Sequence, residues 1–172
     1  KITGNVSING QSFDLARANT SINGKIKQAK FNQYNYQNLA LKGKINNGIF
    51  DVNAVSDDPN ANLNLTASGD FKKDLKNVKL NGNIGNLNIK ALNFYDEALS
   101  ISGEIDGAFD NLDFENPNGY LSLKNLSVTD ETEKLAIDEM KLNAISSENQ
   151  NQITLESKVI NAEIKGKFNL LE

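Results

Sequence analysis

A five-residue pattern of apolar, any, Gly, any, apolar recurs along this chain. It occurs at residues 2–6, 22–26, 41–45, 80–84, 101–105 and 164–168, with a weaker copy at 67–71. Positions two apart share a face of a β-strand, so the apolar residues and the glycine point one way and the polar residues the other. Central glycines often lie roughly 20 residues apart, which is about the length of two strands and two turns. The pattern predicts an all-β chain of up-and-down strand pairs.

The segments between these copies fit the same interpretation. Residues 60–67 alternate polar and apolar, and Asn46-Asn47-Gly48 predicts a tight turn between strands at 39–45 and 49–55. Residues 87–94 depart from alternation, and we expect a strand end followed by a helical turn there. Later strands are expected at 119–123, 135–137, 140–146, 152–157 and 161–170.

Glycine in the middle of a strand marks a bend, a bulge or a close approach. Repeated at one phase, it predicts either a curved wall with a furrow along its apolar face or a sheet that curls around an ordinary core. The pattern leaves both open. If the face is a groove, its lining shares the phase of the glycines and consists of Ile22, Ile26, Leu41, Ile45, Leu63, Leu65, Leu80, Ile84, Ile101, Ile105, Leu121, Leu123, Leu142, Ile164 and Phe168.

Composition removes several classes of function. The 172 residues include 28 Asn but only 38% hydrophobic residues, and the regular apolar spacing argues against a disordered chain. The net charge of -4 is small, its charges are interleaved, and Arg17 is the only arginine, so we expect no nucleic-acid partner. Histidine and cysteine are absent, and with them the commonest general base and covalent nucleophile. We expect no enzyme activity and no cofactor.

Two clusters of oxygen-bearing side chains are candidate calcium ligands. The first is Asp57, Asp58, Asn60 and Asn62, and the second is Asp106, Asp110, Asp113 and Glu115. Neither has the spacing of an EF-hand loop. Asp-Asp-Pro-Asn makes a good turn without metal, and the second cluster is typical of a solvated acidic edge. We expect no metal at either.

The next features are membrane-spanning and signal segments and the two ends of the chain. No segment has the roughly 18 apolar residues that can span a bilayer, and no signal peptide is recognisable. The chain opens at Lys1 within a strand-like pattern. We expect residues 1–172 to be a single β-groove fragment of a longer protein, with Leu171-Glu172 derived from a vector.

Residues 36–51 contain a more specific succession of elements: a strand with a central glycine, an Asn-Gly turn and another strand. They are followed by the Asp-Pro-Asn turn and strand of 57–65 and by Gly69-Asp70-Phe71. This succession resembles the TamB-like family of AsmA-like proteins, the inner-membrane component of the translocation and assembly module. The similarity continues through 91–94, 99–103 and the turn of 116–119 leading to 121–123.

The resemblance implies a long antiparallel sheet folded into a trough, a β-taco, with an apolar inner face and a polar outer face. It implies a periplasmic location, with the parent protein anchored in the inner membrane and meeting an Omp85-type partner at the outer membrane. The implied cargo is phospholipid acyl chains or outer-membrane protein clients. The first alternative is a closed β-sandwich or β-solenoid that serves as a spacer or adhesin module. The second is a carbohydrate-binding module, which the absence of Trp for sugar stacking disfavours.

Overall fold

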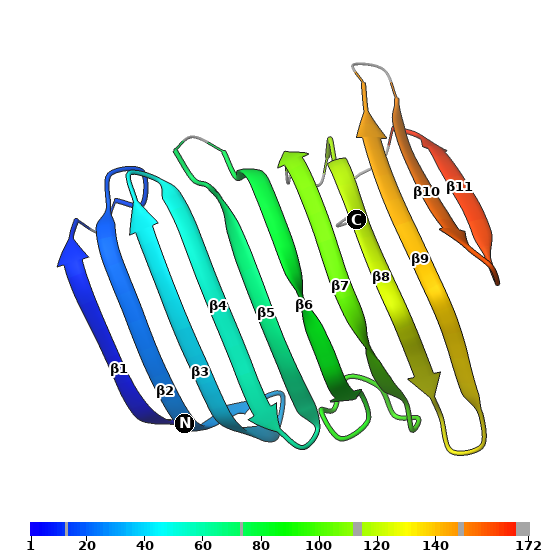
Figure 1. Cartoon of the computed structure of the whole chain (residues 1–172), viewed down its shortest axis with the longest axis horizontal. Helices are drawn as coiled ribbons and strands as arrows, with labels where there is room; N and C mark the ends of the chain where they lie inside the picture. Colours follow the sequence, from blue (N-terminus) through cyan, green and yellow to red (C-terminus); the bar gives the residue numbers. More distant parts are fainter. Residues whose placement is uncertain (13, 73, 112–114, 148–149, 168–172) are drawn as a thin grey trace.

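The chain forms one eleven-stranded antiparallel sheet in which every strand pairs with its neighbours in sequence (Figure 1). The computed structural model describes residues 1–12, 14–72, 74–111, 115–147 and 150–167. The strands are β1 (Ile2–Gln11), β2 (Asn19–Phe31), β3 (Tyr34–Asn46), β4 (Ile49–Asp58), β5 (Ala61–Asp70), β6 (Lys76–Asn88), β7 (Ser100–Asn111), β8 (Asn118–Thr129), β9 (Lys134–Ser146), β10 (Asn151–Ser157) and β11 (Asn161–Gly166). The described residues contain no helix.

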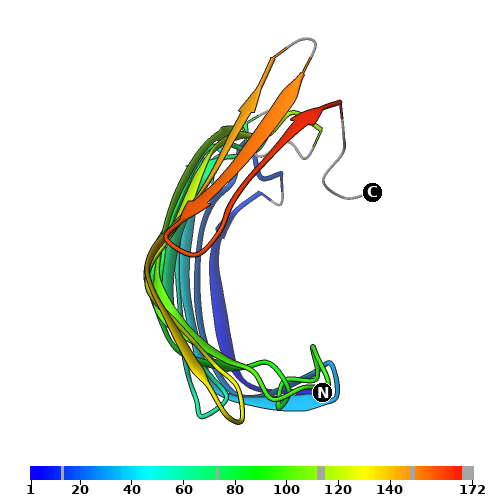
Figure 2. The same cartoon turned by 90° about the vertical axis from the view of Figure 1, so that its right-hand side faces the viewer.

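The sheet is open. Strands β1 and β11 lie at opposite ends of the strand order and do not pair with each other. Seen along the sheet, the strands bow along their length, so that one side of the sheet is concave (Figure 2). The predicted all-β, elongated antiparallel sheet is confirmed. A closed sandwich would need a second sheet, and the described strands all belong to one.

Asparagine accounts for much of the local geometry. The predicted tight turn is confirmed, with β3 ending at Asn46, β4 beginning at Ile49, and both Asn47 (φ 48°) and Gly48 (φ 82°) left-handed. Six of the eight non-glycine residues with positive φ in the described part are asparagine. Asn tolerates this region better than other residues with a Cβ. Part of the unusual Asn content therefore follows from turns and strand irregularities.

Several predicted boundaries are wrong. The two strands expected at 135–137 and 140–146 are one strand, β9, because its pairing with β8 continues through Leu126↔Ile137 and Leu123↔Met140. The last strand ends at Gly166, and residues 168–170 lie outside the described part. The expectation for residues 87–94 is confirmed: β6 ends at Asn88, and the Leu92 amide donates to the Asn88 carbonyl at 3.0 Å in one helical turn.

Candidate functional site

One row of paired residues crosses all eleven strands without a polar side chain. Residues directly opposite each other in a sheet share a face, so the pairing register places them side by side. In strand order the row is Ile8, Ile22, Gly43, Val52, Ala67, Leu80, Gly107, Leu121, Leu142, Leu155 and Ala162. We call the face that carries this row the apolar face.

The neighbouring row on the other face is polar at every position. It consists of Ser7, Asn23, Lys42, Asn53, Thr66, Asn81, Asp106, Ser122, Lys141, Glu156 and Asn161. Several of these side chains bond across strands; the Asn53 amide, for example, donates to Asn64 Oδ1 at 3.0 Å. These two neighbouring rows are therefore apolar on one face and polar on the other across all eleven strands.

The register places the fourteen described members of the predicted lining on the apolar face, and Phe168 lies outside the described residues. The prediction missed other residues of the same face, among them Val52, Met140 and Leu155. They lack the glycine motif that guided the selection. Plain alternation of polar and apolar positions would have found them.

The repeated glycines do not form a single furrow. They share the apolar face but fall into different rows: Gly82 pairs with Leu65 and Ile105, whereas Gly43 pairs with Ile22 and Val52. Neighbouring side chains also occupy the space beside some of them. A Cβ built on Gly69 would lie 2.6 Å from Phe50 Cε1, and one on Gly82 would lie 2.7 Å from Leu65 Cδ2.

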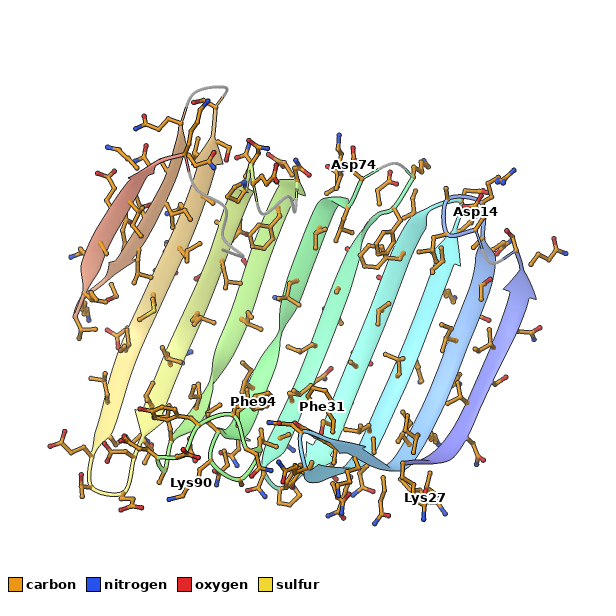
Figure 3. The ribbon with its side chains drawn as sticks, turned by 180° about the vertical axis from the view of Figure 1, so that it is seen from behind. Asp14, Lys27, Phe31, Asp74, Lys90 and Phe94 are labelled. Atoms are coloured by element: carbon orange, nitrogen blue, oxygen red, sulfur yellow. The ribbon has the colours of Figure 1, made fainter. Side chains whose placement is uncertain are left out.

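The apolar face has no second layer within the described chain. A view from behind Figure 1 shows side chains of carbon alone spread along the middle of the sheet (Figure 3). Exposure is greatest at the edge strands, where Ile8 is 65% and Ile164 60% exposed. Six apolar residues of the described chain are buried, and three of them are alanine: Ala18, Ala61, Leu92, Leu126, Ile137 and Ala144. This sheet buries much less apolar surface than a two-layer domain does.

A reciprocal amide clamp joins two connections that are distant in sequence. The Asn32 side-chain amide, in the β2–β3 turn, donates to the carbonyls of Leu92 at 3.1 Å and Asn93 at 2.6 Å. The Asn93 side-chain amide in turn donates to the Asn32 backbone carbonyl at 2.9 Å, across 61 residues of sequence. We call residues 31–34 and 88–95 together the clamped lip. Figure 2 shows this end of the sheet extending towards the concave side.

Beside the clamped lip, Asp58 anchors the β4–β5 turn. Its carboxylate is fully buried and accepts bonds from the Tyr34 hydroxyl at 2.7 Å, the Gln37 amide at 2.8 Å and the Asn60 amide at 2.9 Å. Burial raises the pKa of the Tyr34 hydroxyl, and the adjacent carboxylate of Asp58 also raises it. Asp58 is thus an acceptor for turn and strand donors, in agreement with its interpretation as turn chemistry.

The acidic clusters do not form a ligand set in the described residues. No group of three or more carboxylates there is placed to hold a metal ion. Asp106 instead accepts the Tyr120 hydroxyl at 2.8 Å, and Asp113 lies outside the described part. The hollow nearest Asp106 lies over the polar face and is lined by Asn64, Thr66, Asn81, Asn83, Glu104 and Lys124, among others.

Comparisons with known proteins give no relative. No protein-family model matches the sequence, and no curated protein or solved structure is significantly similar to the chain. In the described residues there is no helix of the length and hydropathy that crossing a bilayer requires.

Proposed function

We propose that this sheet is a segment of a TamB-like groove. Its apolar face, on the concave side of the sheet, guides phospholipid acyl chains. The observation that supports this most is the apolar row from Ile8 in β1 to Ala162 in β11, which no polar side chain interrupts. Its partner row on the opposite face is wholly polar, which suits a wall with water on its outer side.

An acyl chain requires a continuous apolar track. It gains free energy wherever it leaves water for apolar surface, so a track must have no polar break. Backbone amides and carbonyls would be such breaks, but in a continuous sheet they are paired between strands. With strands about 4.8 Å apart, a row across eleven of them extends about 48 Å, which is longer than one acyl chain.

The resemblance to TamB-like proteins supplies the setting of this proposal. In that setting the parent protein is anchored in the inner membrane, crosses the periplasm and meets an Omp85-type protein at the outer membrane. Outer-membrane protein clients are the second cargo of such a groove, because an unfolded strand with alternating polarity also presents an apolar side. A spacer or adhesin role is the competing function, and it requires no ligand on the apolar face.

The test uses two adjacent residues that point to opposite faces. Leu65 lies on the apolar face between Ala54 and Gly82, whereas Asn64 lies on the polar face beside Asn53. Leu65→Asp places a carboxylate in the proposed track, and Asn64→Asp places the same charge on the opposite face. Binding of a fluorescent long-chain fatty acid is measured for both variants and the parent chain, with circular dichroism to confirm the fold.

We expect the parent chain and Asn64→Asp to bind the probe and folded Leu65→Asp to bind at least tenfold more weakly. Water can reach a charge on an open face, so Leu65→Asp should stay folded, at a cost of about 1–2 kcal/mol. A parent chain that binds no fatty acid, or two variants that bind equally, would favour the spacer role.

A further inference from the structure

The clamped lip displays aromatic rings that the fold does not bury. Phe31 directly precedes one clamp residue and Phe94 directly follows the other, and they are 64% and 57% exposed. Tyr95 is 56% exposed. Figure 3 shows Phe31 and Phe94 at the same end of the strands, although they come from different connections. The clamp therefore assembles one exposed aromatic group from two segments distant in sequence.

Other aromatic rings of the β2–β3 hairpin, which contains Phe31, are less exposed than Phe31. Tyr34 and Tyr36 pack edge to face with centroids 5.0 Å apart, and both are partly buried. Phe31 lies 6.5 Å from Tyr36 at the outer side of this group. The hairpin thus has aromatic rings that contribute to its packing and one that is left facing solvent.

Two exposed lysines precede Phe31 within the last five residues of β2. Lys27 and Lys30 are exposed near the end of β2, and in the described residues neither has a carboxylate within ion-pair distance. The charge of the chain is also less evenly distributed than its interleaved pattern suggests: residues 1–47 contain seven Lys or Arg and one Asp. On the other segment Lys90 lies 4.0 Å from Glu131, and Asp96 and Glu97 follow Tyr95. Positive charge is therefore concentrated on the hairpin side.

We propose that the clamped lip docks onto the headgroup region of an anionic phospholipid bilayer. Exposed aromatic rings with polar neighbours favour the interface between water and the hydrocarbon of a bilayer. Lysines close to that interface are attracted to the phosphates of anionic lipids. The clamp holds both aromatic segments in place before binding, so little conformational entropy is lost on contact. The excess of negative charge lies in residues 48–172, which contain 11 Lys or Arg and 21 Asp or Glu. Screening over about 8–10 Å weakens the effect of those carboxylates that lie further than this from Lys27 and Lys30.

This docking surface is distinct from the apolar face and does not depend on acyl chains entering a groove. The experiment sediments the whole chain with vesicles of phosphatidylcholine and phosphatidylglycerol, and with vesicles of phosphatidylcholine alone. Two lip variants are compared with the parent chain: Phe31→Ser with Phe94→Ser, and Lys27→Gln with Lys30→Gln. All four side chains are exposed, so we expect both double variants to fold.

Each lip variant has a matched control elsewhere on the sheet. Ile49→Ser removes an exposed apolar side chain at the opposite strand ends. Lys42→Gln with Lys44→Gln removes two exposed lysines from β3, at least eight residues or roughly 27 Å of strand from Tyr34 and beyond the screening length. The controls have the same chemistry as the tests but lie away from the lip.

We expect the parent chain to bind the anionic vesicles, with weaker binding to pure phosphatidylcholine and at high salt. The lysine variant should bind on the order of fivefold more weakly per lysine, the aromatic variant at least tenfold more weakly, and the controls within about twofold of the parent. Equal loss in the controls, or no binding by the parent chain, would overturn the proposal. A Phe31- and Phe94-dependent dimer without vesicle binding would also overturn it and assign the rings to a second copy.

The outcome is separable from that of the proposed groove. Leu65→Asp should weaken fatty-acid binding at least tenfold and leave vesicle binding unchanged, and the lip variants should weaken vesicle binding and leave fatty-acid binding unchanged. A chain that binds vesicles but no fatty acid would support the lip and contradict the groove.

Discussion

The hydroxyl of Tyr34 donates a 2.7 Å hydrogen bond to Asp58 Oδ1, which joins the start of β3 to the end of β4 next to the clamped lip. The carboxylate is fully buried, yet its partners among the described residues are two backbone amides and this hydroxyl and include no cation. Several hydrogen-bond donors stabilise a buried carboxylate, and without the carboxylate these buried donors would lack an acceptor.

Replacing Asp58 with alanine should therefore destabilise the sheet. The Tyr34 hydroxyl and the Gln37 and Asn60 amides would lose their acceptor, and we expect the free energy of unfolding to fall by about 2–4 kcal/mol. The neighbouring Asp57 is exposed and supplies the control, with an expected change within about 0.5 kcal/mol for Asp57→Ala. Urea denaturation measures both. Equal effects would show that Asp58 is not the anchor of this turn.

Stability should also decline at alkaline pH through Tyr34. Burial, and then the Asp58 carboxylate, raise its pKa in the folded state, so the unfolded chain loses the proton first. The contribution is fully present below the unfolded pKa of about 10 and is lost as pH rises from there through the folded pKa. Between pH 9 and about 11.5 the parent chain should lose more stability than Tyr34→Phe. Parallel curves of unfolding free energy against pH would contradict this.

Two central glycines of the repeat should respond differently to the same substitution. A Cβ on Gly82 would lie 2.2 Å from the Asn64 carbonyl oxygen, so Gly82→Ala must force β5 and β6 apart. A Cβ on Gly24 has Val6 Cγ2 at 3.6 Å as its nearest neighbour, which is ordinary contact. We expect Gly82→Ala to lower the unfolding free energy by about 2–4 kcal/mol.

Gly24→Ala should be neutral or stabilising by up to about 1 kcal/mol, because alanine restricts the unfolded chain. Thermal unfolding of the two variants side by side is sufficient for the comparison. If both variants lost equal stability, the glycines would be required for strand curvature at every repeat rather than for local strand spacing.

The β3–β4 turn supplies a further prediction. Gly48 has φ 82°, and a Cβ there would also lie 2.6 Å from Lys72 Cγ. Gly48→Ala should cost about 1–2 kcal/mol because left-handed backbone is unfavourable for alanine. Gly48→Asn should cost less, since asparagine tolerates this region. Denaturant midpoints of the two variants give the measurement, and the reverse order would mean that contact with Lys72 dominates over backbone strain.

The class of fold, the face of the sheet on which each side chain lies and the Asn47-Gly48 turn were all predictable from the order of residues. These depend on local rules: side chains alternate along a strand, and a two-residue hairpin requires left-handed backbone. Leu41 and Lys42 therefore face opposite ways whatever surrounds them. The repeated glycines marked the apolar face for the same reason, although their spacing did not reveal that they fall into different rows.

Whether a second layer covers the apolar face was not predictable from the sequence, since alternation is identical in an open sheet and in one half of a sandwich. Nor was it predictable which residues join across strands, because a pairing register depends on every turn and bulge before it. Gly24 and Gly82 have the same motif but different neighbours for that reason. The pairing of Asn32 with Asn93 and the burial of Asp58 are of the same kind: each joins segments that only the packed sheet brings together.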